Sequence, residues 1–128
     1  MSAAISFDHL VVAARTLDEG VRWCEATLGI TPGPGGKHAL MGTHNRLLRL
    51  SGEGFSDSFF EILAIDAESR APGRARWFGL DTIDLSAGPR LVNWAARTTQ
   101  IDAHLDALRK SGSDAGRAMI DRVPMRRC

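Results

Sequence analysis

The sequence lacks most of the patterns that mark common classes of protein. Its 2 cysteines cannot build a disulfide framework, and Cys24 lies in a helical pattern where it would pack as a small apolar residue. There is no Gly-x-Ser-x-Gly segment, no phosphate-binding loop and no paired cysteine motif. Serine hydrolase, nucleotidase and zinc-ribbon functions therefore receive no support.

An excess of charge and long apolar runs are missing too. The 16 Lys and Arg residues nearly balance 15 Asp and Glu residues, for a net charge of +1, which argues against a nucleic-acid partner. No run approaches the ~20 apolar residues that span a bilayer, and the N-terminus lacks a basic segment followed by a long apolar one. We therefore expect a cytoplasmic protein that binds neither nucleic acid nor membrane.

What the sequence does contain is a weak internal repeat. A shift of 84 places sets Phe7 on Leu91 and His9 on Asn93, so that a strand followed by a helix occurs twice. The length of 128 residues suits one domain, 1–128, and no linker divides it. The repeat predicts two related modules that share a core.

The first module, at about 5–66, begins with a strand over residues 5–14 that is apolar on both faces. Thr16 then predicts the start of an amphipathic helix and Gly29 its end. The glycine- and proline-rich residues 30–37 predict a short or irregular edge strand. Two further strands are expected over 41–50 and 57–65, joined by a turn at 51–54.

The second module, at about 89–123, is shorter. A polar connection with one helical turn at 77–80 leads to a strand at 90–98 and a helix at 101–110. Residues 116–123 offer one more strand. By analogy with the first module, two strands are missing.

A strand-helix-strand-strand-strand unit that occurs twice, with His on its first strand and Glu on its last, resembles the vicinal-oxygen-chelate superfamily. This superfamily includes glyoxalases, bleomycin-resistance proteins and dioxygenases, and three short segments are similar to its glyoxalase-like branch. These segments are Phe7–Val12, Gly42–Asn45 and Phe60–Leu63. The resemblance implies an α+β fold in which paired βαβββ modules form a cupped mixed sheet, with the second module incomplete.

The resemblance also implies a divalent metal (Zn, Ni, Mn or Fe) on the concave face of the sheet. The family's ligand positions, on the first and last strands of each module, fall on His9 and Glu61 in the first module and on Asn93 in the second. The fourth position falls on a strand that the sequence does not contain.

The residues themselves allow two interpretations of this pair. By two-residue periodicity His9 and Glu61 share one face if their strands pair, and an imidazole with a carboxylate suits a transition metal. Alternatively, Glu61 is a buried structural group paired with His9, or with Arg46 or Arg49 on the neighbouring strand.

Other candidates carry similar alternatives. Either His38 or His44 could supply a third ligand, or both are solvated side chains near a turn. Asn45 could bind a ligand or satisfy the backbone at a strand entry. Trp77 and Trp94 could wall a pocket for an apolar ligand or belong to the core.

Two functions follow. The first is a metal-dependent lyase, isomerase or dioxygenase that acts on a small molecule, with Glu61 as catalytic ligand or base. The second is a metal-free small-molecule binding protein of the sequestration or resistance type, with Asn45, Trp77 and Trp94 as binding residues. In both cases the missing strands would leave a sheet edge uncovered, which predicts a homodimer.

Overall fold

The computed structural model describes residues 5–113. Over this range the chain forms five strands, two α-helices and one 3-10 turn, so the predicted α+β class is confirmed. In chain order the elements are β1 (Ile5–Ala13), α1 (Leu17–Leu28), β2 (Gly33–His38), β3 (Thr43–Gly52), β4 (Phe55–Ile65), η1 (Trp77–Gly79), β5 (Arg90–Thr98) and α2 (Ile101–Lys110).

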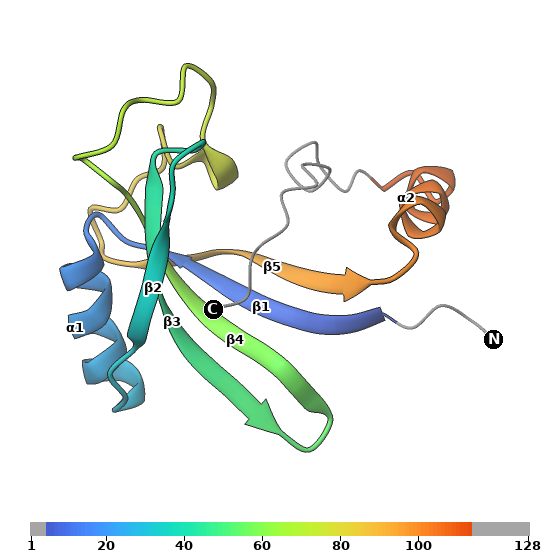
Figure 1. Cartoon of the computed structure of the whole chain (residues 1–128), viewed down its shortest axis with the longest axis horizontal. Helices are drawn as coiled ribbons and strands as arrows, with labels where there is room; N and C mark the ends of the chain where they lie inside the picture. The colour runs from blue at the N-terminus through green and yellow to red at the C-terminus, as the bar shows by residue number, and fades with distance from the viewer. Residues whose placement is uncertain (1–4, 114–128) are drawn as a thin grey trace.

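The described strands form one open mixed sheet in the order β2-β3-β4-β1-β5. β1 runs parallel to β4, and the other neighbouring pairs are antiparallel. The four strands of the first module are therefore adjacent, and β5 extends the sheet beside β1 (Figure 1). This arrangement places the first and last strands of the first module next to each other, the pairing on which a shared face for His9 and Glu61 depends.

Helix α1 begins and ends where the sequence predicts. The Thr16 hydroxyl accepts a hydrogen bond from the backbone N–H of Glu19 at 3.1 Å, and Gly29 adopts a left-handed conformation with φ of 71° after the last turn. Gly20 lets the helix approach the sheet, because a Cβ at this position would overlap Cγ2 of Ile62. Figure 1 shows α1 lying along the sheet.

Each face of the sheet carries its own apolar cluster. The face against α1, called here the helix face, holds Val12, Ala14, Cys24, Phe60 and Ile62. The opposite face, called here the site face, holds Val11, Ala13, Leu63 and Leu80, with Phe78, Ile83 and Leu85 of the 66–89 connection packed against them. Since neighbouring residues of β1 enter opposite clusters, both faces of the strand are covered, as its composition predicts.

The β3–β4 hairpin is tighter than the sequence predicts. Residues 51–54 were expected to form the turn, but Gly52 pairs with Phe55 across the hairpin. Gly54 takes a φ of 83°, a conformation that is easily reached only without a Cβ, so the chain reverses within two residues. Strand β4 is correspondingly two residues longer than predicted, and β3 has the predicted length but lies two residues further along the chain.

The second module contributes β5 and α2 to the described part of the chain, at the predicted positions. In Figure 1, α2 lies beyond the end of β5. The strand predicted at 116–123 falls outside the described residues. None of the helices within 5–113 combines the length and the apolar character needed to cross a membrane.

Candidate functional site

Strand register brings two of the predicted site residues onto the site face. Glu61 pairs with Val11 of β1 on one side and with Leu47 of β3 on the other. Asn45 lies two pairs further along the β3–β4 ladder, opposite Leu63. Because directly paired residues of neighbouring strands share a face, Glu61 and Asn45 lie on the same side of the sheet as Val11.

Glu61 is a buried carboxylate held by an amide. Its residue is only 5% exposed, and Oε2 accepts a hydrogen bond from Asn45 Nδ2 at 2.5 Å. Within residues 5–113 no hydrogen bond reaches the other carboxylate oxygen, Oε1. Arg46 cannot be its partner, since that guanidinium donates to the carbonyl oxygens of Pro32 and Gly33 instead. Asn45 thus holds one carboxylate oxygen of Glu61, and the other oxygen is available to bind another group.

His9 is also buried, at 6% exposure, and its ring is fixed from two sides. Nδ1 donates to Asp8 Oδ2 at 2.6 Å, and Arg97 in turn donates to Asp8 Oδ1 at 3.1 Å. The imidazole stacks on Phe59, with ring centroids 4.4 Å apart and an interplanar angle of 9°. A carboxylate on one ring nitrogen fixes the tautomer and leaves Nε2 with a lone pair, the usual arrangement for a ligand or base.

Asn93 lies on β5 opposite Val11, so it flanks the site from the side opposite Glu61. Its Oδ1, the atom that would coordinate a metal, accepts a hydrogen bond from the backbone N–H of Trp94 at 2.8 Å. Across the described range no three His, Cys, Asp or Glu side chains gather closely enough to hold a metal ion.

The structure separates the two histidines that the sequence left equivalent. His38 pairs with Thr43 on the site face, where its Nδ1 lies 2.9 Å from Thr43 Oγ1 and its Nε2 lies 3.3 Å from Asn45 Nδ2. His44 instead lies 4.0 Å from Asp66 Oδ2. Only His38 reaches the Glu61 network, and only the register of β2 against β3 reveals this.

The two tryptophans proposed as pocket walls lie in different places. Trp77 meets His38 edge-on, with centroids 5.5 Å apart, and so borders the Glu61 network. Trp94 pairs with Leu10, which packs in the helix-face cluster, and it is 62% exposed. The described structure does not bring Trp94 to Glu61.

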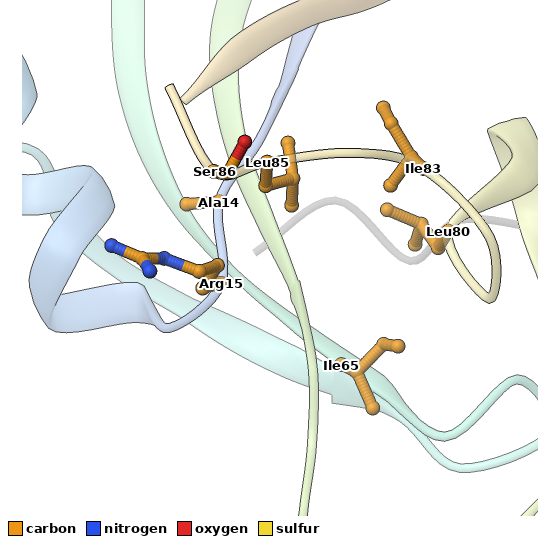
Figure 2. Close-up of a pocket in the computed structure, with 7 residues that line it drawn as sticks. All are labelled: Ala14, Arg15, Ile65, Leu80, Ile83, Leu85 and Ser86. Carbon is orange, nitrogen blue, oxygen red and sulfur yellow. The ribbon is translucent and has the colours of Figure 1, made fainter. Parts of the chain in front are cut away.

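A pocket of about 380 Å³ opens where β1 and β4 end. Figure 2 shows that it is lined from three segments: the residues after β1, the last residue of β4 and the connection that precedes β5. The lining residues are Ala14, Arg15, Ile65, Leu80, Ile83, Leu85 and Ser86. Glu61 and His9 are not among them, so this pocket is distinct from the polar site.

Residues 7–127 match the model of a protein family that is described as glyoxalase-like domain. The chain belongs to the glyoxalase-like domain family. The resemblance drawn from the three short segments is therefore confirmed, including the placement in the vicinal-oxygen-chelate superfamily. No curated protein sequence matches the chain.

Solved structures support the same fold. Methylmalonyl-CoA epimerase from Mycobacterium tuberculosis is 25% identical with a TM-score of 0.54, over 84% of this chain and 64% of that one. A variant of the Streptomyces coelicolor epimerase in complex with 2-nitronate-propionyl-CoA is 20% identical with a TM-score of 0.56, over 85% and 74%. A hypothetical protein from Bacillus halodurans reaches a TM-score of 0.61 at 14% identity. The chain thus spans 64% of the length of the first of these epimerases, less than two thirds, and 74% of the second.

Proposed function

We propose that this glyoxalase-like domain is a metal-assisted isomerase or lyase that moves a proton at a carbon next to a carbonyl group of a small molecule. The observation that supports this most directly is a pair of side chains on the site face, His9 and Glu61, whose orientations are fixed by hydrogen bonds. His9 Nε2 and Glu61 Oε1 are both free of hydrogen bonds within the described residues, while their other polar atoms are held by Asp8 and Asn45. Preorganised groups of this kind are typical of catalytic sites.

Two of the three predicted ligands suit a divalent metal. His9 and Glu61 would hold it, because an imidazole oriented by a carboxylate and a buried carboxylate are common ligands of Zn, Ni, Mn and Fe(II). Asn93 fits less well, since its amide oxygen is engaged by the Trp94 N–H. When bound, such a metal supplies Lewis-acid stabilisation of negative charge on substrate oxygens.

The residues of the chain supply the remaining chemistry. Glu61 has one free oxygen, which serves either as metal ligand or as base; as base, at 5% exposure, it would take a proton from a substrate carbon with little competition from water. Asn45 holds the other oxygen at 2.5 Å and so limits rotation of the carboxylate. The epimerase named in several structural neighbours makes isomerisation the favoured reaction class over oxygenation.

A second function is metal-free binding of a small molecule. Two observations favour it: the amide oxygen of Asn93 is engaged, and a pocket of about 380 Å³ opens at the ends of β1 and β4. In this case Trp77 would contribute aromatic surface near His38, and Glu61 would be a structural carboxylate.

Metal content decides between the two functions. We would measure it on protein purified without a metal-binding tag, for the natural sequence and for His9→Ala, Glu61→Ala and Asp8→Ala. The metal-assisted function predicts near one equivalent of a transition metal that the first two variants lose. Asp8→Ala should bind it about 10- to 100-fold more weakly, because Asp8 orients the His9 ring.

His44→Ala is the matched control, since this histidine contacts Asp66 rather than the Glu61 network, and it should retain the metal. If the natural protein carries no metal and also takes up none on addition, while the variants remain folded, the metal-assisted function is wrong. Metal-free binding would then be the better explanation.

A further inference from the structure

A chain of hydrogen bonds links β2, β3 and β4 beneath the site. The backbone N–H of Gly36 donates to Asn45 Oδ1 at 2.8 Å. Asn45 Nδ2 contacts Glu61 Oε2 at 2.5 Å and His38 Nε2 at 3.3 Å. His38 Nδ1 contacts Thr43 Oγ1 at 2.9 Å. All polar atoms of the Asn45 side chain are therefore engaged within the protein.

The donor and the acceptor of each of these hydrogen bonds can be assigned by starting from the Gly36 N–H. Gly36 N–H is a donor, so the Asn45 atom that it reaches must be the oxygen. The amide nitrogen then faces Glu61 and His38, and it carries two N–H groups, one for each. His38 Nε2 must consequently accept, which places the ring proton on Nδ1, where it donates to Thr43 Oγ1.

His38 is suited to this role because its buried position favours the neutral ring. Burial lowers the pKa of His38 below its ordinary value of 6.5, against the opposing influence of the Glu61 charge. A neutral ring can accept at Nε2, whereas a protonated ring would present a second donor to the Asn45 amide.

The backbone makes room for this arrangement at one position. A Cβ on Gly35 would overlap both the backbone oxygen and Oδ1 of Asn45, while a Cβ on Gly36 would meet nothing within 4 Å. Strand β2 can thus bring the Gly36 N–H to the amide only because residue 35 has no side chain.

We propose that Asn45 and His38 are positioning residues for Glu61. Asn45 fixes Oε2 and leaves Oε1 for the substrate, and His38 accepts the second amide N–H so that Asn45 cannot turn its oxygen toward the carboxylate. Asn45 therefore acts on the site through Glu61 and does not itself bind the small molecule. What Glu61 does once positioned rests on the proposed function, but the order of the hydrogen bonds does not.

The test is the tautomer of His38, read from ¹⁵N chemical shifts of the imidazole nitrogens near neutral pH. Its signals are assigned among the 4 histidines by their loss in His38→Gln. We expect the natural protein to show the Nδ1–H tautomer. In Asn45→Leu no side-chain group donates to Nε2, so the fraction of the Nε2–H tautomer should rise.

Ser58→Ala is the control, because Ser58 is another buried polar residue of the sheet whose hydroxyl donates to the Phe7 carbonyl, and its loss should leave the tautomer unchanged. An Nε2–H tautomer in the natural protein would overturn the proposal even if no variant folds. So would an unchanged tautomer in folded Asn45→Leu. Since the experiment uses no metal and no substrate, its failure is separable from failure of the proposed function.

Discussion

At the scale of single residues, the orientation of Glu61 depends on a glycine two strands away. Gly35→Ala should displace the Asn45 amide, because the added Cβ would overlap Asn45 oxygens that belong to the strand backbone as well as the side chain. We expect a loss of about 1–3 kcal/mol in the free energy of unfolding, measured by urea denaturation, as for other overpacked sites.

Gly36→Ala is the matched control for this prediction, since its Cβ would enter open space. Its effect should stay within about 0.5 kcal/mol. Equal free energies of unfolding for the two variants would contradict close packing of β2 against Asn45.

The sequence predicted some of the site residues but not all of their contacts. His9 and Glu61 were found because they fall on the family's ligand positions and share a face by two-residue periodicity, and Asn45 because it lies in the Gly42–Asn45 segment. The contact of Asp8 with His9 was not, because successive residues of a regular strand point to opposite faces. Here the β1–β5 register shifts between Phe7 and His9, and this irregularity accompanies the contact of the two neighbouring side chains.

At the scale of elements, the connection over residues 66–89 is anchored by a buried aspartate. Asp66 is 3% exposed, and it accepts hydrogen bonds from Ser69 Oγ at 2.9 Å and from the Glu68 N–H at 3.1 Å. Lys37 of β2 lies 3.3 Å from the same carboxylate. This anchor precedes the segment that covers part of the site face, so its loss should loosen that cover.

The anchor should weaken in acid. The hydrogen bond from Ser69, aided by the Glu68 N–H and Lys37, holds the pKa of Asp66 below its ordinary value of 3.8. Its stabilisation is therefore complete above about pH 3.8 and is lost as the pH falls through the lower pKa of the folded protein.

Measured as the free energy of unfolding against pH, the natural protein should lose stability more steeply than Asp66→Asn as the pH falls below the ordinary Asp66 pKa of 3.8. Asp18→Asn, which alters an exposed aspartate on α1, should follow the natural protein. Parallel curves for the natural protein and Asp66→Asn would contradict an anchoring role.

The sequence predicted more about helices and strands than about the contacts of single residues. The cap at Thr16 and the stop at Gly29 fix α1 locally, since each acts on its own helix end. The connection could not be predicted in the same way, because its path depends on which apolar residues, such as Leu80 and Ile83, find the site-face cluster.

At the scale of the whole molecule, the sheet ends at β5 among the described strands, and two apolar side chains there are exposed: Leu91 at 63% and Trp94 at 62%. Such an edge invites pairing with another chain. We therefore propose that the protein is a homodimer that covers this edge. The division into modules at about 5–66 and 89–123 of a single domain, 1–128, likewise stays a prediction.

Sedimentation velocity tests the dimer. The natural protein should sediment as a dimer, and Trp94→Lys should shift it toward monomer, because a charge would be buried at the interface. Leu28→Lys is the control, since it places the same charge on an exposed apolar residue at the end of α1. A monomeric natural protein, or a Trp94→Lys variant as dimeric as the control, would contradict the proposal.

The sequence by itself determined the family, the α+β class and the strands that carry His9 and Glu61, because alternation, helix caps and glycine stops act over a few neighbouring residues. Only the tertiary structure decided which polar atoms are engaged. The register of β2 on β3 and of β3 on β4 brings His38, Asn45 and Glu61 into one hydrogen-bonded chain although they are far apart in sequence. The register of β5 on β1 likewise sets Trp94 apart from them, since pairing across strands follows from the packing of the whole sheet and not from any local pattern.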